Sequence, residues 1–319
     1  MSGAFSRDAA TAQVAALRTD ALAGLSGTAK TLPCKWLYDA QGCRLFEAIT
    51  RLPEYYPTRT EMRILAESGA DIARAVGPGA AVVEFGPGDG AKAVQLLGAL
   101  AAPAAYLPVD IAPEWLDAAA ARVAEAFPAL AVRPVVADFT LPFDLAGRAA
   151  GSTTHLGFFP GSTIGNFEPR EALAFLRRAR SSLRPGARML LGADLVKDIA
   201  VLKAAYDDAA GVTAAFNLNL LARLNREAGA DFDLSAFRHE ARWNPGLERI
   251  EMHLVAERAQ GVTLAGHRFR FAAGESIHTE SSHKYRPDRL RELAGQAGWR
   301  PVSMWTDPQA LFSVWLLEN

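Results

Sequence analysis

The feature that most constrains the fold is an alternation of short hydrophobic runs and helical stretches between residues 60 and 196. The runs "AAVVEFG", "AAYLPVDI", "LAVRPVVADF", "THLGFFPGSTIGNF" and "RMLLGADL" are separated by segments with the apolar spacing of helices, such as "PEWLDAAAARVAEAF" and "PREALAFLRRARSSL". Strands that alternate with helices form parallel sheets, because each helix carries the chain back to the edge where the previous strand began. The sequence therefore predicts an α/β domain.

The alternation stops after residue 196 and resumes near the C-terminus. Residues 197–283 read as mostly helix ("DIAVLKAAYDDAAGVTAAFNLNLLARLNREAG") and then as strand-like stretches ("RIEMHLVAE", "GVTLAGHRFRF" and "ESIHTESSHKY"). The C-terminal part predicts a helix, a strand near Pro301 to Trp305 and a last strand near Leu311 to Leu317, joined by a hairpin-like turn. This is the order of the seven-stranded sheet of class I methyltransferases, in which the last strand inserts antiparallel; a nicotinamide dehydrogenase rarely ends so.

A glycine-rich turn follows the first hydrophobic run, in "VVEFGPGDG", and the helical stretch "AKAVQLLGAL" comes directly after it. Glycine adopts positive φ and lets the backbone approach a ligand without a Cβ in the way. The turn alone does not identify the ligand, since Ala91 also completes a G-x-G-x-x-G/A dinucleotide pattern. The residues around the turn must therefore indicate whether it binds a dinucleotide or another nucleotide.

Acidic residues stand at the expected strand ends. Asp110 ends the second strand, where a carboxylate can accept hydrogen bonds from both ribose hydroxyls. Asp138 follows the third strand and could accept from an adenine amino group while Phe139 covers a ring face, and Glu84 can brace the turn. Each acid alone also fits an exposed loop or a helix N-cap. Together with the glycines they predict a site for S-adenosylmethionine, its amino acid portion lying along Gly86 to Gly90.

The composition excludes several classes of protein. With 319 residues, a net charge of -1 and a pI near 6.6, the chain has no basic footprint for nucleic acid. Cys34 and Cys43 have no histidine cluster beside them, and His278 and His283 have no third ligand in register, so we expect neither disulfide nor metal. The N-terminus is unlike a signal peptide and no apolar stretch reaches the roughly 18 residues of a membrane span. We expect a cytoplasmic monomer without a membrane partner.

Three stretches outside the nucleotide half contain groups suited to a small polar substrate. "LPCKWLYDAQGCRLFEAITRLPEYYPTRTE" places Tyr38 and Tyr55 among other aromatics, although plain packing is the simpler interpretation. Asn166, after the fourth strand, can donate to a carboxylate, or it caps the following helix. Glu280 and Ser282 are two apart in a strand-like stretch, so one face could bind both nitrogens of an imidazole, or be merely solvated.

The stretches "KWLYDAQG", "LFEAITRLPEYYPTRTE", "GSTIGNF" and "HTESSHKY" closely resemble the bacterial histidine Nα-methyltransferase family, which makes the trimethylhistidine betaine for ergothioneine biosynthesis. The resemblance covers nearly the whole chain. It implies a methyltransferase domain with a Rossmann-like sheet, residues 60–196 and 284–319, and an α+β substrate-binding domain, residues 1–59 and 197–283. It also implies S-adenosylmethionine as the methyl donor and L-histidine as the substrate, bound between the two domains.

The resemblance also assigns roles to individual residues. Asn166 and Tyr206 would hold the carboxylate of histidine, and Tyr38, beside the α-amino group, would be the catalytic residue. Glu280 and Ser282 would hold the imidazole, with Tyr55 beside them unless Tyr56 takes that place. The residues assigned to the substrate are Tyr38, Tyr55, Asn166, Tyr206, Met252, Glu280 and Ser282; those assigned to the cofactor are Phe46, Glu84, Gly86, Gly88, Lys92, Asp110, Asp138, Phe139 and Gly161.

Some alternatives stay open at the level of sequence. The glycine turn departs from the family, which often has Ser and Thr near its lysine where this chain has Pro87, Asp89 and Ala93 around Lys92. The substrate could be another aromatic amino acid or a histidine derivative. More distant alternatives are a non-catalytic S-adenosylmethionine-binding protein and a nicotinamide dehydrogenase. The acceptor of the amino proton is either Tyr38 or a water molecule.

Overall fold

The computed structural model describes residues 2–141, 143, 145, 152 and 154–319, without the side chains of residues 2–10 and 114. The chain divides into two compact units. One unit, here the sheet unit, comprises Pro57–Val196 and His283–Asn319, and the other, here the inserted unit, comprises Met1–Tyr56 and Lys197–Ser282. The sequence analysis placed the three boundaries after residues 59, 196 and 283.

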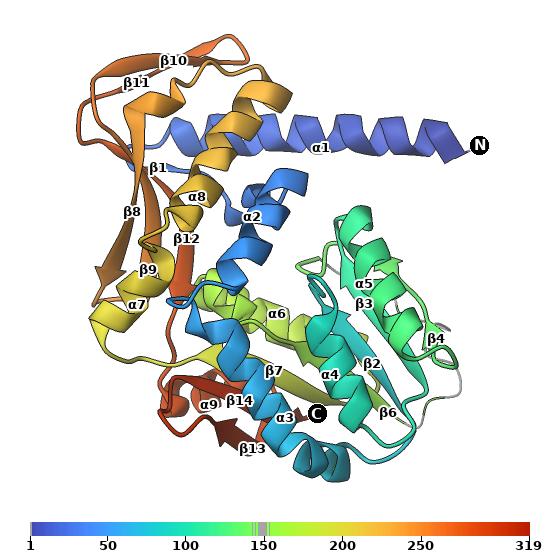
Figure 1. The fold of residues 1–319 in the computed structure, drawn as a ribbon. Helices are drawn as coiled ribbons and strands as arrows, with labels where there is room; N and C mark the ends of the chain where they lie inside the picture. The colour runs from blue at the N-terminus through green and yellow to red at the C-terminus, as the bar shows by residue number, and fades with distance from the viewer. Residues whose placement is uncertain (1, 142, 144, 146–151, 153) are drawn as a thin grey trace. The chain divides into compact units, whose positions relative to one another are not determined.

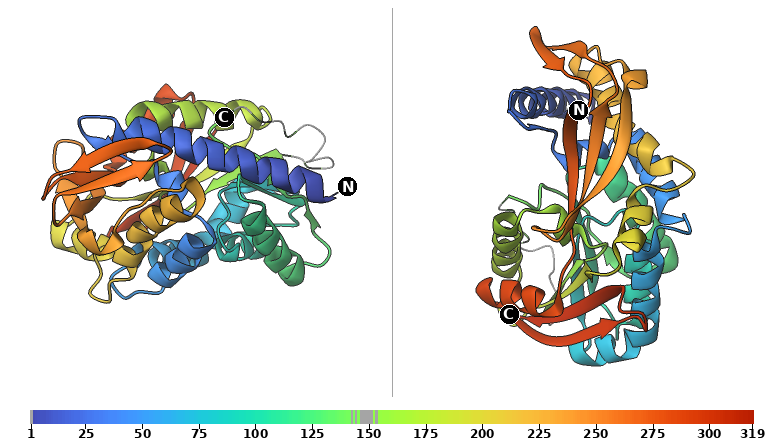
Figure 2. Two further views of the ribbon diagram at one scale, coloured as in Figure 1. Left: turned by 90° about the horizontal axis from the view of Figure 1, so that it is seen from above. Right: turned by 90° about the vertical axis from the view of Figure 1, so that its left-hand side faces the viewer.

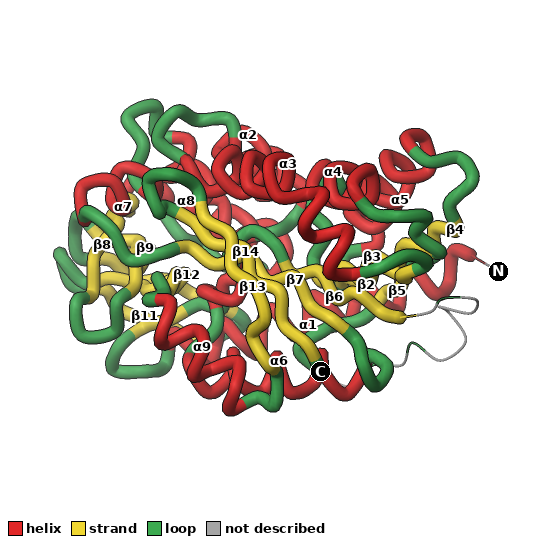
Figure 3. The backbone as a smooth tube through the Cα atoms, turned by 90° about the horizontal axis from the view of Figure 1, so that it is seen from below, coloured by secondary structure: helices red, strands yellow, loops and turns green. Residues whose placement is uncertain are grey.

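The sheet unit is built on a mixed sheet with the strand order β13-β14-β7-β6-β2-β3-β4 (Figures 1 and 3). Its strands are β2 (Ala80–Phe85), β3 (Ala105–Asp110), β4 (Ala131–Val132), β5 (Val135–Val136), β6 (Thr154–Phe159), β7 (Arg188–Asp194), β13 (Arg300–Thr306) and β14 (Phe312–Glu318). β2 pairs in parallel with β3 and β6, and β6 with β7, whereas β14 is antiparallel to both β7 and β13. The predicted parallel sheet with an antiparallel last strand is confirmed.

Helices cover both faces of this sheet (Figure 3). They are α3 (Tyr56–Val76), α4 (Ala91–Ala99), α5 (Pro113–Ala126), α6 (Pro169–Ser182) and α9 (Pro287–Gln296). One core lies between the sheet and helices α6 and α9, and the other lies between the sheet and α3 and α4. Every residue of β2 is buried, as expected for a central strand whose sequence is a continuous apolar run interrupted only by Glu84.

The third expected strand is interrupted rather than continuous. It consists of the short strands β4 and β5, both of which pair with β3 in parallel. Arg133 and Pro134 separate them. Proline has no N–H to donate to the ladder, which is why the strand breaks at this position.

The inserted unit contains a sheet with the order β1-β12-β9-β8 and a separate hairpin of β10 and β11. The strands are β1 (Lys30–Thr31), β8 (Phe237–Asn244), β9 (Arg249–Ala256), β10 (Gln260–Leu264), β11 (His267–Phe271) and β12 (Ser276–His283). Its helical segments are α1 (Ser2–Leu25), η1 (Cys34–Leu37), α2 (Ala40–Thr50), α7 (Ile199–Tyr206), α8 (Val212–Arg223), η3 (Leu224–Ala228) and η4 (Leu234–Ala236). Figure 2 shows these elements from two further sides.

Two features of the inserted unit differ from the sequence interpretation. The stretch after residue 197, read as mostly helix, contains two helices, α7 and α8, separated by residues 207–211. The Asp208 carboxylate accepts the N–H groups of Val212 and Thr213 at 2.9 and 2.7 Å, which starts a new helix there. Strand β8 was not named in the sequence analysis.

Within the part of the chain that the structure describes, no helix combines the length and apolarity that crossing a bilayer requires.

Candidate functional site

The glycine turn joins β2 to α4 in the sheet unit. Gly86, Gly88 and Gly90 have φ values of 71°, 55° and 76°, a region that favours glycine. A Cβ at Gly88 would meet no atom within 4 Å, whereas one at Gly90 would lie 3.0 Å from the Cα of Ala119 in α5. The turn thus leaves its backbone open at Gly88 and lets α4 pack closely on α5 at Gly90, as in dinucleotide-binding turns.

A buried carboxylate joins three segments beside this turn. Glu61 of α3 is 1% exposed, and its Oε2 lies 2.5 Å from Nζ of Lys92 in α4 and accepts the N–H of Gly161 at 2.8 Å. A Cβ at Gly192 of β7 would lie 2.0 Å from Glu61 Oε1, so a larger residue there would displace the Glu61 carboxylate. The structure therefore brings Lys92 and Gly161, both predicted for the cofactor, together through Glu61, which received no role from the sequence.

Glu84 is fully buried in β2, where its Oε2 accepts a hydrogen bond from the hydroxyl of Tyr106. Burial raises the pKa of Glu84 to about 8; the charges of Glu61 and Asp89 add to this rise, and Tyr106 and Lys92 oppose it. At neutral pH the group is therefore mainly a neutral acid. The hydrogen bond from Tyr106, and not an ion pair, holds the Glu84 side chain in position.

Asp110 and Asp138 stand at the ends of β3 and of the split third strand. Asp110 Oδ1 accepts the N–H of Ala112 at 2.9 Å, and Asp138 Oδ1 accepts both the N–H and the hydroxyl of Thr140 at 2.8 and 2.5 Å. Burial raises the pKa of Asp110; the N–H groups of Ala112 and Ile111 oppose this rise and the charge of Asp138 adds to it. Each carboxylate uses Oδ1 to shape its own loop.

Phe139 packs at the edge of the apolar core beside the turn. Its ring centroid lies 6.2 Å from that of Phe85 and 5.9 Å from those of Phe159 and Phe175. A Cβ at Gly86 would be 3.6 Å from the Phe139 ring. The ring therefore adjoins the glycine turn while most of its contacts are with other phenylalanines.

Asn166 is the last residue of η2 (Thr163–Asn166), which follows β6. Helix α6 has Glu168 as its N-cap, and the Glu168 N–H donates to the side chain of Glu171 at 2.9 Å. The alternative interpretation of Asn166 as the cap of this helix is therefore wrong. Its amide has no part in starting α6.

In the inserted unit, the aromatic residues that the sequence assigned to the substrate or the cofactor form one cluster with Phe216. The Tyr38 ring centroid lies 5.5 Å from those of Phe46 and Phe216, and Phe46 lies 6.2 Å from Tyr55. Tyr55 in turn lies 6.3 Å from Tyr206. The rings meet mostly edge to face, the arrangement that aromatic pairs favour. Phe216 of α8 received no role from the sequence, because its contacts come from segments distant in the chain.

The two adjacent tyrosines have different surroundings. Tyr55 lies in the aromatic cluster, whereas the Tyr56 hydroxyl accepts a hydrogen bond from Lys197 Nζ at 2.6 Å. The same ammonium lies 4.5 Å from the Tyr56 ring centroid. The structure therefore places Tyr55 in the aromatic cluster and the Tyr56 side chain beside Lys197.

The other residues predicted for the substrate, except Asn166 of the sheet unit, also lie in this unit. The Tyr206 hydroxyl is 2.7 Å from Ser282 Oγ, and Met252 is buried in β9. Burial raises the pKa of Tyr38 well above its ordinary value, and the negative charge of Glu280 adds to this effect. The Tyr38 phenol is therefore protonated at neutral pH.

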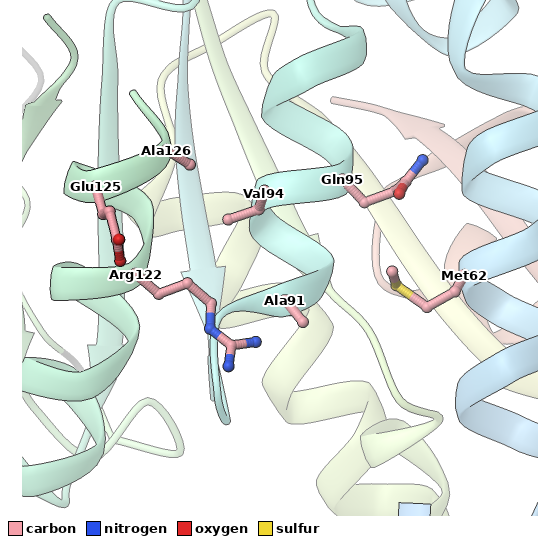
Figure 4. A pocket seen from close by; sticks show the side chains of 7 residues that line it. All are labelled: Met62, Ala91, Val94, Gln95, Arg122, Glu125 and Ala126. Carbon is pink, nitrogen blue, oxygen red and sulfur yellow. The ribbon is translucent and has the colours of Figure 1, made fainter. Parts of the chain in front are cut away.

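A groove of about 440 Å³ lies elsewhere on the sheet unit, along α3, α4 and α5 (Figure 4). Its polar lining residues Gln95, Arg122 and Glu125 are partly or fully exposed, and Arg122 pairs with Asp89 at 2.9 Å. The groove contains none of the predicted site residues. Among the residues that the structure describes, no three His, Cys, Asp or Glu side chains are placed to hold a metal ion.

Comparison with known proteins shows that the chain matches a known family. The family described as "Histidine-specific methyltransferase, SAM-dependent" matches residues 17–319. The chain is 45% identical over 311 residues to the histidine N-alpha-methyltransferase of Mycolicibacterium smegmatis, covering 96% of each chain. It is 42% identical over 304 residues to the protein of the same name from Mycobacterium tuberculosis, covering 94% of each.

A fungal relative is similar over part of its length. "Ergothioneine biosynthesis protein 1" of Neurospora crassa is 30% identical to this chain over 295 residues, which cover 87% of this chain and 32% of the fungal protein.

We predict that Glu84→Gln changes how stability depends on pH. The native Glu84 has a pKa of about 8, above the ordinary 4.5, so folding retains a proton that the unfolded chain releases between these values. The contribution of Glu84 is fully present below the lower value and is lost as the pH rises through the upper one, with a slope of at most about 1.4 kcal/mol per pH unit. Glutamine cannot ionise, so the stability of the variant should fall less than that of the wild type as the pH rises through this range.

Urea unfolding of both proteins between about pH 6 and pH 9 measures this difference. Glu125→Gln, which changes an exposed carboxylate of the same unit, is the matched control and should follow the wild type. Parallel curves for wild type and Glu84→Gln would mean that Glu84 is ionised in the native protein.

Proposed function

The chain belongs to the family of histidine-specific, S-adenosylmethionine-dependent methyltransferases, and we propose that it methylates the α-amino nitrogen of L-histidine three times. The product would be trimethylhistidine, hercynine, for ergothioneine biosynthesis. The near full-length similarity to mycobacterial histidine N-alpha-methyltransferases is the observation that carries this proposal. The name of the fungal relative supports the biosynthetic role.

The sheet unit supplies all of the proposed cofactor residues except Phe46. The backbone left open at Gly88 suits the amino acid portion of S-adenosylmethionine, and the Lys92 ammonium complements its carboxylate. The carboxylate of Asp110 suits the ribose hydroxyls, and that of Asp138 suits the adenine amino group. When bound, the cofactor supplies a methyl group already activated on a sulfonium. Phe46, also assigned to the cofactor, lies in the inserted unit.

The remaining proposed roles concern histidine. Glu280 would accept an imidazole N–H, and the Ser282 hydroxyl would bond the other ring nitrogen. Tyr206, 2.7 Å from Ser282, and Asn166 of the sheet unit would hold the carboxylate. A charge-assisted bond to Glu280 would distinguish histidine from an apolar aromatic amino acid, because the latter leaves a buried carboxylate unpaired.

The amino group must lose its proton before it can attack, and the structure bears on which group receives that proton. The Tyr38 phenol is protonated, and both burial and the charge of Glu280 oppose its ionisation. We infer that Tyr38 orients the amino group through its hydroxyl and that water takes the proton. The rings of Tyr38, Phe46 and Phe216 suit the fixed positive charge that accumulates on the nitrogen.

Mass spectrometry of L-histidine incubated with the protein and S-adenosylmethionine tests the proposed function. We expect mono-, di- and trimethylhistidine to appear in succession, with fragmentation placing every methyl group on the α-nitrogen. Histamine, which lacks the carboxylate, should remain unmodified. Methylation of a ring nitrogen, or a preference for another amino acid, would contradict the proposal.

We predict that Tyr38→Phe lowers kcat by less than about 100-fold, because a group that only orients the amine contributes less than the roughly 10²–10⁴-fold of a general base. The acidic limb of the pH–rate profile should keep its midpoint in the variant. A larger loss, or disappearance of that limb, would identify Tyr38 as the proton acceptor.

We predict that Glu280→Ala lowers kcat/KM for histidine by roughly 10- to 150-fold, corresponding to a charge-assisted hydrogen bond of about 1.5 to 3 kcal/mol. Activity on tryptophan should fall far less, because the variant no longer buries an unpaired carboxylate against it. Glu257→Ala removes an exposed carboxylate of the same unit and should leave the histidine-to-tryptophan ratio unchanged. The same ratio in Glu280→Ala and wild type would remove Glu280 from the substrate site.

A further inference from the structure

Three buried polar side chains in the inserted unit form a connected set of hydrogen bonds. Nδ2 of Asn217, in α8, lies 2.9 Å from His239 Nδ1 and donates to the backbone oxygen of His253 at 3.2 Å. Oδ1 of Asn217 accepts the Thr279 hydroxyl at 2.6 Å. The other ring nitrogen of His239, Nε2, is 2.8 Å from the backbone oxygen of Tyr206. Asn217, His239 and Thr279 are 0%, 9% and 1% exposed.

The partners determine where the protons of this set lie. A backbone oxygen only accepts, so His239 carries its proton on Nε2 and donates it to Tyr206. Nδ1 then accepts from Asn217, whose two amide protons are both used. Burial lowers the pKa of His239, which agrees with a neutral ring. The amide and the imidazole are thus satisfied in one arrangement only, and a buried network of this kind specifies a unique geometry.

The set holds the backbone of residues proposed to bind histidine. His239 bonds the carbonyl of Tyr206, the last residue of α7. The Thr279 hydroxyl also faces the carbonyl of Met252 at 3.0 Å, and Thr279 directly precedes Glu280. Tyr206, Met252 and Glu280 come from α7, β9 and β12, so no single element sets their relative positions.

We propose that Asn217, His239 and Thr279 are positioning residues that set selectivity for the imidazole of the substrate, by fixing Tyr206, Met252 and Glu280 relative to one another. The inference rests on the proposed function. The three residues act through the backbone of their partners and do not touch the substrate. Apolar packing alone is non-directional, whereas hydrogen bonds to carbonyl oxygens fix both distance and direction.

The two variants Thr279→Val and Thr279→Ser test the proposal. Valine keeps the shape of threonine but loses the hydroxyl, whereas serine keeps the hydroxyl and loses a methyl group. We expect Thr279→Val to raise KM for histidine by about 5- to 100-fold and to lower the histidine-to-tryptophan ratio of kcat/KM. Thr279→Ser should stay close to wild type in both, and kcat should change little in either variant.

Ser313→Ala is the matched control for lost stability. It removes a buried hydroxyl that donates to the carbonyl of Ala193 at 2.9 Å, but it lies in β14 of the sheet unit. It should lower the melting temperature without changing KM or the substrate ratio. If Thr279→Val behaves like Ser313→Ala, or like Thr279→Ser, in these kinetic measurements, the network is only structural and the proposal is overturned.

A second pair covers the case in which Thr279→Val does not fold. His239→Gln retains an N–H that can reach Tyr206, whereas His239→Phe does not, so KM should rise in the phenylalanine variant and much less in the glutamine variant. Equal KM values in this pair would overturn the proposal.

Hydrogen exchange separates failure of the network from failure of the proposed function. Peptides covering residues 199–206, 249–256 and 276–283 should exchange faster in Thr279→Val than in wild type and Thr279→Ser. This readout needs no methylation. If the wild type does not methylate histidine, the proposed function fails, and hydrogen exchange still tests whether the network holds these segments. Equal exchange in Thr279→Val and wild type would overturn the proposed positioning role.

Discussion

Glu61 places a carboxylate, 1% exposed, between the ammonium of Lys92 and the N–H of Gly161, which lies 100 residues further along the chain. A buried carboxylate needs such partners, since desolvation is costly without them. The contact ties α3 and α4 to the segment after β6, and the absence of a Cβ at Gly192 of β7 leaves room for the Glu61 carboxylate. The open backbone of the glycine turn and the carboxyl ends of the strands can therefore meet one ligand in a fixed arrangement.

The inserted unit combines apolar and directional contacts. Edge-to-face rings gather Tyr38, Tyr55 and Tyr206 with Phe46 and Phe216, and the buried amide of Asn217 is bonded on both sides. The same burial that packs Tyr38 also keeps its phenol protonated. In the proposed reaction the unit would therefore orient the amine rather than remove its proton, since the methyl group arrives already activated.

The fold was largely predictable, because hydrophobic periodicity is a local property. Alternating runs predicted the parallel sheet, and the C-terminal hairpin predicted its antiparallel strand. The errors have local causes that periodicity does not register. Pro134 interrupts the third strand, and Asp208 accepts the first N–H groups of α8, so that the helical stretch after residue 197 is divided into two helices.

The sequence by itself determined the class of sheet and the glycine turn with the acids Asp110 and Asp138, because strand ends of a parallel sheet meet at one edge whatever else the chain does. Only the tertiary structure distinguished the surroundings of Tyr55 from those of Tyr56, and only it disclosed the contacts of Glu61 and Asn217. Their partners lie tens of residues or more away in the chain. A hydrogen bond depends on distance and angle in space, and spacing along a sequence does not specify either quantity.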